Sequence, residues 1–418
     1  MIILIDLDGT FTNTAHPQFK RMKDGLDGTI ISTIPVFEGA VEFVNHQKSL
    51  GNKIIIVSDS HPKYVNKIAN EIFNSEFIFL ADKPNPDRTL EYIEADSKLK
   101  SKFIDRDNFI LIGDSFLDIE LGRRLNIKTV QTKFYKATEI VERDGIGQDW
   151  KPLKMGPTYY AKKYSEINDI IEKPFDNLLA IEAAFKGRAS FKAVAFKDFK
   201  TPNGFTAFRC LARQEDGECD EYARADKYYQ IDNPNRSPDF LNTLALGVNS
   251  YMEKLESMPE FHWDYLTYVS DKKTTSPPNK MKEIFDLVNS SIPKTKLFEW
   301  RNDVEGSLRN RPDYKSRREF IHKYLYTAEG IDLNEKSVIV IDDQFTSSAT
   351  AYEIATQLKN KGVKNILFIA LFYLILPIQS RLCPRCNNNM KITIRREDGA
   401  KFYYCNTKAG CGLSERIN

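Results

Sequence analysis

The sequence predicts an α/β protein with two consecutive parallel-sheet domains and a small cysteine-rich β module at the C-terminus. Short apolar strands such as Ile2–Ile5, Lys53–Val57 and Phe109–Ile112 alternate with segments of helical periodicity in the first third of the chain, a pattern typical of parallel sheets covered by helices. A similar apolar strand, Ser337–Ile341, precedes another helical segment near the C-terminus. Four of the six cysteines follow it in a compact pattern.

Length and composition limit the possible classes. A chain of 418 residues exceeds one ordinary hydrophobic core, so two or three domains are expected. The net charge of +2 gives no strong field for nucleic acid or membranes. The first residues lack the basic segment of a secretory signal, and the longest apolar run, Ile366–Ile378, is interrupted by proline and too short to span a bilayer. These features favour a cytoplasmic protein with no membrane partner, in which clustered cysteines hold a metal.

Two carboxylates, Asp6 and Asp8, follow the first strand directly. Ligands of open α/β sheets bind beyond the carboxyl ends of the strands, so both residues are expected at a binding edge. A carboxylate can attack an anionic phosphate when a cation such as Mg²⁺ screens their repulsion. Taken alone, the pair also fits a solvated acidic turn, so its partners decide between the two interpretations.

Polar residues also follow three further predicted strands, and in chain order they are Ser58, Lys83, and the pair Asp114 and Asp118. Together with Asp6-Leu7-Asp8-Gly9-Thr10, this order resembles the four motifs of the haloacid dehalogenase (HAD) superfamily. The resemblance implies a Rossmann-like domain over residues 1–150. It also implies an Mg²⁺-dependent phosphatase that forms an aspartyl-phosphate intermediate.

The same resemblance implies a role for each residue. Asp6 is expected to be the nucleophile, and Asp8 the acid/base that protonates the leaving oxygen. Ser58 would donate to a phosphoryl oxygen, and Lys83 would pair with Asp6 and the phosphate. The expected metal ligands are Asp6, Asp8, Asp114 and Asp118. The gaps between the first three motifs leave no room for a large cap domain, so the site is expected to be open to a nucleotide, a sugar phosphate or a nucleic-acid end.

A second domain is expected over residues 151–378. Periodicity weakens after Gln131, and residues 145–157 contain glycine and proline typical of a linker. Tyr159–Ile171 is expected to be helical. Residues 175–263 alternate strands with polar loops, and no motif identifies their role.

The strand Ser337–Ile341 leads into two adjacent acids, Asp342 and Asp343, a loop of small residues and a predicted helix over Ala351–Lys361. Backbone N–H groups at such a helix N-terminus can hold a phosphate. The pattern resembles the phosphoribosyl pyrophosphate (PRPP) motif of type I phosphoribosyltransferases. The resemblance implies that the acids contact ribose hydroxyls, often through Mg²⁺. The loop residues that would cradle the 5-phosphate are Thr346, Ser347, Ser348 and Thr350.

Ser348 departs from that motif, which has glycine at this position. Glycine reaches positive φ without steric cost, and serine does not. Two interpretations therefore stay open: a second enzyme activity beside the phosphatase, and a regulatory domain that senses PRPP or a nucleotide and controls the phosphatase. Upstream, the loop Asp271–Thr275 could hold pyrophosphate, and a polar stretch with several arginines could close over it, although a solvated helical face also explains them. These arginines are Arg301, Arg309, Arg311, Arg317 and Arg318.

Cys383 and Cys386 form one C-x₂-C pair, and Cys405 and Cys411 lie across a predicted hairpin over Met390–Tyr404. Four thiolates in this arrangement bind a structural Zn²⁺ tetrahedrally, with no position left open for catalysis. The module is expected over residues 379–418.

This cysteine pattern resembles the C-terminal zinc ribbons of bacterial type IA topoisomerases. The hairpin also carries aromatic and basic side chains: Phe402, Tyr403, Lys391, Arg395 and Arg396. The resemblance implies nucleic acid as a partner, bound by stacking and phosphate contacts. A module that contacts protein is the alternative.

Overall fold

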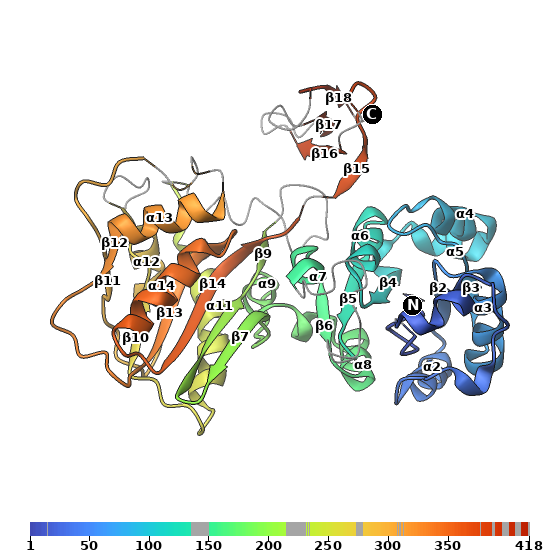
Figure 1. Ribbon diagram of the computed structural model, residues 1–418, viewed down its shortest axis with the longest axis horizontal. Helices are drawn as coiled ribbons and strands as arrows, with labels where there is room; N and C mark the ends of the chain where they lie inside the picture. Colours follow the sequence, from blue (N-terminus) through green and yellow to red (C-terminus); the bar gives the residue numbers. More distant parts are fainter. Residues whose placement is uncertain are drawn as a thin grey trace. The chain divides into compact units, whose positions relative to one another are not determined.

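The computed structural model describes residues 1–14, 16–134, 150–214, 231, 233, 235–272, 279–306, 308, 311, 313–376, 378–386, 389–394, 401–405 and 411–416. The predicted linker residues 145–149, the loop residues Lys273–Thr275, and the arginines Arg309, Arg395 and Arg396 lie outside these ranges. The chain divides into two compact units (Figure 1). In the described residues, unit 1 comprises Met1–Pro174 and Ile375–Asn418, and unit 2 comprises Phe175–Gln214 and residues from 231 to Leu374.

Unit 1 is built on a parallel sheet of order β3-β2-β1-β4-β5-β6. Its strands are β1 (Ile2–Ile5), β2 (Lys53–Val57), β3 (Glu76–Ile78), β4 (Phe109–Gly113), β5 (Lys128–Thr132) and β6 (Tyr159–Ala161). β1 lies between β2 and β4, with Leu4 opposite Ile55 and Leu111. This order confirms the Rossmann-like sheet predicted for the N-terminal region, because it brings the ends of β1, β2 and β4 to one edge.

The helices of unit 1 follow the strands in alternation: α1 (Lys20–Lys23), α2 (Ala40–Ser49), α3 (Pro62–Ile68) with η3 (Ala69–Phe73), α4 (Asp87–Ala95), α5 (Ser97–Phe103), α6 (Phe116–Arg124), α7 (Trp150–Lys154) and α8 (Tyr164–Glu172). Short turns complete them: η1 (Pro17–Phe19), η2 (Ile31–Thr33) and η4 (Arg106–Asn108). Leu4, Ile55 and Leu111 pack on one face with Ile93 of α4 and Leu121 of α6. Alternate strand residues are therefore buried on both faces, as expected for a covered parallel sheet.

Two expectations about the end of unit 1 were wrong. Tyr159–Ala161 is the edge strand β6, paired in parallel with β5, and the helix begins only at Tyr164. The apolar residues of a three-residue strand directly before an amphipathic helix fit the spacing of that helix. The sequence pattern therefore does not show where the strand ends and the helix begins. The predicted boundary at residue 150 falls inside unit 1 because β6 and α8 complete its fold.

Unit 2 has its own sheet, of order β10-β13-β14-β8-β7, with β9 beside the end of β14. The strands are β7 (Val194–Thr201), β8 (Gly204–Cys210), β9 (Arg213–Gln214), β10 (Tyr265–Tyr268), β13 (Ser337–Phe345) and β14 (Asn365–Leu374), and a separate hairpin pairs β11 (Phe298–Trp300) with β12 (Leu325–Thr327). All pairs in the main sheet are parallel except β7 with β8. The region 175–263, without an assigned role from sequence, supplies β7, β8 and β9 to this sheet.

The helices of unit 2 are α9 (Ala180–Ala184), α11 (Pro238–Glu256), α12 (Lys280–Leu287), α13 (Tyr314–Tyr324) and α14 (Ala349–Asn360). Leu244 and Val248 of α11 share one core with Ile284 of α12 and with Ile339 and Ile369 of the sheet. Within the part of the chain that the structure describes, none of the helices has the length and apolarity that crossing a bilayer requires.

The cysteine-rich module is an antiparallel sheet of β15 (Gln379–Leu382), β16 (Asn389–Ile394), β17 (Lys401–Cys405) and β18 (Ser414–Arg416). Its buried centre consists of Cys383, Met390 and Cys405, with Tyr403 and Leu413 packed against them. The hairpin predicted over Met390–Tyr404 is present as β16 and β17. Tyr403 is thus half-buried in the core of the module, which limits its surface for stacking on a base.

Candidate functional site

The motif residues of unit 1 meet at the carboxyl ends of β1, β2 and β4. Asp6 continues β1, and its backbone N–H donates to Ile112 O at 2.9 Å. Asp114 follows β4, and both carboxylates are 5% exposed. Thr10 Oγ1 lies 3.5 Å from Asp6 Oδ2 and 3.5 Å from Asp114 Oδ1, so one hydroxyl links the two acids.

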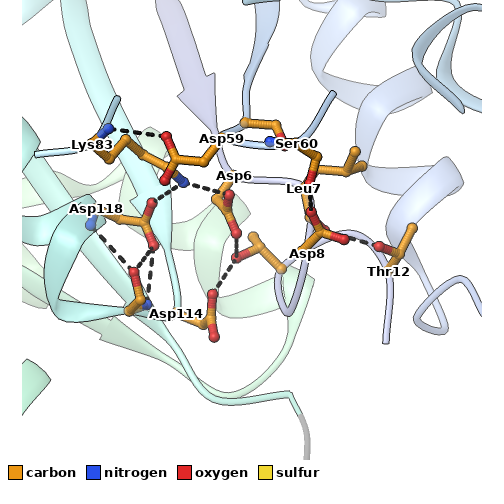
Figure 2. Close-up of polar contacts among 12 residues, drawn as sticks. Asp6, Leu7, Asp8, Thr12, Asp59, Ser60, Lys83, Asp114 and Asp118 are labelled. Carbon is orange, nitrogen blue, oxygen red and sulfur yellow. Dashed lines mark hydrogen bonds and ion pairs between the residues drawn. The ribbon is translucent and has the colours of Figure 1, made fainter. Parts of the chain in front are cut away.

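Lys83 enters this site from the loop after β3. Its Nζ donates to Asp6 Oδ1 and to Asp118 Oδ1, each at 2.6 Å (Figure 2). The Lys83 backbone N–H donates to Asp59 Oδ1 at 2.9 Å, which fixes the loop against the end of β2. Asp118 is held in turn by Ser115, whose backbone N–H and Oγ donate to its Oδ2 at 3.0 and 2.7 Å. The structure therefore brings together the predicted residues of the first, third and fourth motifs.

Charge is not balanced in this cluster. Burial raises the pKa of Asp6; the Lys83 ammonium opposes that rise, and Asp118 and Asp114 add to it. Burial alone would lower the pKa of Lys83, but the carboxylates of Asp118 and Asp6 outweigh it and raise that pKa, so Lys83 stays charged. When all three carboxylates are ionised, the single ammonium leaves two negative charges to be compensated, which a bound cation would do.

The cluster fits a divalent cation. Asp6, Asp114 and Asp118 each offer one carboxylate oxygen, and the three oxygens lie within 4.8 Å of one another. Hard oxygen ligands of this kind suit Mg²⁺, and the ion would supply the missing charge. Only glycine fits at position 9 beside this cluster, because its φ is +101° and a Cβ there would lie 2.6 Å from Asp114 Oδ2.

Asp8 has a different environment from the one predicted. Figure 2 shows Asp114 and Asp118 together on one side of Asp6 and Asp8 on the other, and the Asp8 side chain is absent from the metal group formed by the described residues. Its carboxylate instead accepts hydrogen bonds from Thr14, Ser60 and Tyr64 at 2.6, 2.9 and 2.9 Å. The assignment of Asp8 as a metal ligand therefore stays a prediction, and its place beside Asp6 suits the predicted acid/base.

Ser58 is at the end of β2, with 1% of its surface exposed. Its Oγ accepts a hydrogen bond from the Ser60 backbone N–H at 3.1 Å. This contact uses an oxygen lone pair and not the hydroxyl hydrogen, so Ser58 can also donate to a phosphoryl oxygen. The sequence did not single out Ser60, Thr14 or Tyr64, since a serine beside Ser58 and an apolar helix position carry no separate signal.

The acid pair of unit 2 lies within strand β13 rather than after it. Asp342 is 7% exposed, and its Oδ1 accepts from the Asp343 backbone N–H at 3.0 Å. Burial raises the pKa of Asp342, and the Asp343 charge adds to the rise. Asp343 Oδ2 forms an ion pair with Lys280 Nζ at 2.7 Å.

This pair does not fit a divalent ion in the way that the motif implies. The Lys280 ammonium already compensates the charge of Asp343. The nearby Asp271 accepts from the Met281 backbone N–H at 2.8 Å, and burial raises its pKa to about 6. Among the residues that the structure describes, these acids do not form a three-ligand group close enough for one ion. The ribose contact predicted for Asp342 and Asp343 stays a prediction, and Lys280 already pairs with Asp343.

The loop after β13 contains one residue in the left-handed backbone region. Ser348, the residue in the glycine position, has φ +63° and ψ +3° and directly precedes α14. Thr346 Oγ1 lies 3.4 Å from Arg317 Nη1. Lys272 lies 4.5 Å from the centre of the Phe320 ring, and Arg311 lies 5.1 Å from it. The remaining predicted residues, Ser347 and Thr350, belong to the same turn and the first helical residues.

The four cysteines of the C-terminal module converge as predicted. Cys383 Sγ lies 3.5 Å from Cys411 Sγ, and Cys386 Sγ lies 3.4 Å from Cys405 Sγ. These separations are far from the roughly 2.05 Å of a disulfide. All four sulfurs lie within 4.8 Å of one another, which suits tetrahedral Zn²⁺ with Zn–S bonds of about 2.3 Å.

No family model and no curated protein matches the sequence. Solved structures similar to it include a HAD-superfamily hydrolase from Ehrlichia chaffeensis, 14% identical, covering 41% of this chain and 96% of that chain with a TM-score of 0.28. A hydrolase from Pseudomonas syringae is 16% identical over 41% and 98% of the two chains, with a TM-score of 0.30. A HAD family hydrolase from Deinococcus radiodurans R1 with bound phosphate and sodium is 14% identical over 41% and 95%, with a TM-score of 0.32. Such distant likeness assigns no activity.

Proposed function

We propose that this protein is an Mg²⁺-dependent phosphomonoester hydrolase that works through an aspartyl-phosphate intermediate. The observation that carries the proposal is the convergence of Asp6, Lys83, Asp114 and Asp118 at the carboxyl edge of the unit 1 sheet. A carboxylate, an ammonium and two further acids in one buried cluster match what phosphoryl transfer to a carboxylate requires.

In the first step, Asp6 attacks phosphorus with one carboxylate oxygen, and the bond from phosphorus to the leaving oxygen breaks. Asp8 gives its proton to that oxygen, which departs as an alcohol. Lys83, 2.6 Å from Asp6 Oδ1, is placed to pair with the charge on the transferred group, and Ser58 donates to one of its oxygens. Mg²⁺, when held by Asp6, Asp114 and Asp118, supplies the positive charge that offsets repulsion between carboxylate and phosphate.

In the second step, water attacks phosphorus and Asp8 accepts the proton that the water loses. The acyl-phosphate bond breaks, inorganic phosphate leaves, and Asp6 returns to its carboxylate form. Asp8 must therefore hold a proton in one half of the cycle and accept one in the other. Its position two residues from the nucleophile, outside the Asp6–Asp114–Asp118 group, allows both.

The proposed substrate class depends on how large a molecule can reach the cluster at the carboxyl edge of the unit 1 sheet. Between Thr10 and Ser58, the described residues form only short turns, α1 and α2 before β2. No large cap is present among them, so the site is proposed to accept a nucleotide, a sugar phosphate or a phosphorylated nucleic-acid end. The zinc-bound module is proposed to contact nucleic acid, and protein is the alternative partner.

Unit 2 is proposed to bind PRPP or a nucleotide. The positive φ of Ser348 favours this, because the residue adopts the backbone that glycine provides in the phosphate loop. Asp342 and Asp343 would accept hydrogen bonds from ribose hydroxyls. Such a site supports either a sensor that controls the phosphatase or a phosphoribosyltransferase beside it.

The proposed hydrolase is tested by phosphate release from nucleotides, sugar phosphates and oligonucleotides phosphorylated at either end. Purified full-length protein is incubated with Mg²⁺ and, in parallel, with excess chelator. Release from at least one class that stops in chelator is expected. If no class releases phosphate with Mg²⁺, the hydrolase proposal is rejected.

A further inference from the structure

Asp8 lies in a buried network of hydroxyl groups. Its Oδ1 accepts from Thr14 Oγ1 at 2.6 Å and from Tyr64 Oη at 2.9 Å, and its Oδ2 accepts from Ser60 Oγ at 2.9 Å. These donors come from the loop after β1, from helix α3 and from the loop after β2. Asp8 is 5% exposed, and Tyr64 is fully buried.

The two oxygens of Asp8 are thus not equivalent. A carboxylate oxygen offers about two lone-pair positions, and Oδ1 uses both for Thr14 and Tyr64. Among the described residues, Oδ2 accepts one side-chain hydrogen bond, from Ser60, and it keeps a position for a proton. Two donors from different segments hold Oδ1, so the plane of the carboxyl group has little freedom to rotate.

Tyr64 is itself fixed in place. Its ring is fully buried, and its Oη lies 3.1 Å from Thr14 Oγ1 as well as 2.9 Å from Asp8 Oδ1. Because Thr14 gives its one hydroxyl hydrogen to Asp8, it accepts from Thr12 Oγ1 at 2.6 Å, and the network continues to Thr12 in the loop after β1. Burial raises the pKa of Tyr64, and the Asp8 charge adds to the rise, so the phenol keeps its proton.

We propose that Tyr64 is a positioning residue for proton transfer: it anchors Asp8 Oδ1, so that Oδ2 carries the proton that the leaving oxygen receives. This inference rests on the proposed hydrolase function. When the phosphorus–oxygen bond breaks, its electron pair stays on the leaving oxygen, and the proton moves there from Oδ2. The Asp8 carboxylate that remains keeps its three hydroxyl donors and regains a proton from the attacking water.

A pair of substrates separates positioning from simple stability. The leaving oxygen of β-glycerophosphate is strongly basic and needs the proton, whereas para-nitrophenyl phosphate releases a stable anion that does not. The quantity to compare is kcat/KM, because it reports steps up to departure of the leaving group. Tyr64→Phe removes the hydroxyl and keeps the buried ring, and Tyr92→Phe, whose hydroxyl donates to Glu76 away from the site, is the matched control.

Tyr64→Phe is expected to lower kcat/KM for β-glycerophosphate about tenfold or more and for para-nitrophenyl phosphate by less than about threefold. Thr14→Val, which removes the other donor to Oδ1, is expected to show the same selectivity and serves if Tyr64→Phe does not fold. Equal losses on both substrates, or no loss, would overturn the inference while leaving the hydrolase function standing. A wild-type protein that turns over neither substrate and also releases no phosphate from nucleotides, sugar phosphates or oligonucleotides would overturn both.

Discussion

Lys83 Nζ and Asp6 Oδ1 are 2.6 Å apart, and each side chain is 6% exposed. The ammonium also contacts Asp118 at the same distance, so it is shared between two carboxylates of the cluster. A buried cation that is shared in this way orients both carboxylates and keeps Asp6 in place before a phosphate arrives. Because of this contact, a substitution of Asp6 should keep a group that can accept from Lys83.

Asp6→Asn is expected to lower the rate of phosphate release about a thousandfold or more and to leave the fold intact. The amide cannot form the acyl phosphate, but its oxygen can still accept from Lys83. One negative charge disappears from a cluster with a negative excess, so the melting temperature without Mg²⁺ is expected to stay the same or rise. Phosphate assays and thermal unfolding measure the two effects, with the exposed Asp176→Asn as control. Turnover equal to wild type would remove Asp6 from the mechanism.

Residues at strand ends were predictable, since four apolar strands in order place their following residues at one edge of a sheet. Asp6, Lys83, Asp114 and Asp118 meet for that reason. Tyr64 was not predictable, because a tyrosine at an apolar position of a helix has the spacing of an ordinary core residue.

Lys280 was not predictable for a related reason. It starts helix α12, and its ion pair with Asp343 joins residues separated by 63 positions in the sequence. No local pattern encodes that distance. The sequence could therefore indicate an acid pair but not the ammonium that pairs with it.

The cysteine module is expected to bind one Zn²⁺ per chain and to unfold when the ion is removed. Its buried centre of Cys383, Met390 and Cys405 is too small to fold without a metal. The proposed phosphatase site belongs to a separate core, and phosphate release is expected to return once Mg²⁺ is restored after chelation. Elemental analysis measures the zinc. Cys383→Ser should lose it, and Cys210→Ser, at a buried cysteine of the unit 2 sheet, should not; zinc-free wild-type protein with an ordered module would contradict the assignment.

Asp271 should make unit 2 less stable as pH rises. Its pKa in the folded protein is about 6, raised mainly by burial from an ordinary value of 3.8. Between these values the unfolded chain loses its proton first, so stability declines as pH rises from about 4 to about 6 and stays low above that. The loss is about 2 to 3 kcal/mol.

Asp271→Asn stays neutral and is therefore expected to be more stable than wild type at pH 8 and similar to it at pH 4. Denaturation followed by fluorescence of Trp263 and Trp300, in a Trp150→Phe background, reports on unit 2. The amide oxygen can still accept from the Met281 N–H, so the change mainly removes charge. A variant that is less stable than wild type at pH 8 would show that the ionised form is the favoured one.

The ion pair between Lys280 and Asp343 predicts how unit 2 binds its ligand. If the acids hold ribose hydroxyls, PRPP or a nucleotide should raise the melting temperature of unit 2. The free energy of unfolding should increase by about 2.7 kcal/mol when the ligand is at a hundredfold excess over Kd. Because the ammonium already balances Asp343, the shift is expected to persist in excess chelator. Asp342→Ala combined with Asp343→Ala should remove it and leave phosphatase turnover, measured without the ligand, unchanged.

The products of that binding then separate the two functions of unit 2. Consumption of PRPP with release of pyrophosphate would identify a transferase, and unchanged ligand with an altered phosphatase rate would identify a sensor.

Lys280→Met removes the compensating charge without shortening the side chain greatly, so ligand binding in this variant should become dependent on Mg²⁺. A wild-type shift that already requires Mg²⁺ would show that Lys280 gives way to the ion. No shift with either compound at millimolar concentration would remove the ligand site, and the strained backbone at Ser348 would then serve the fold alone.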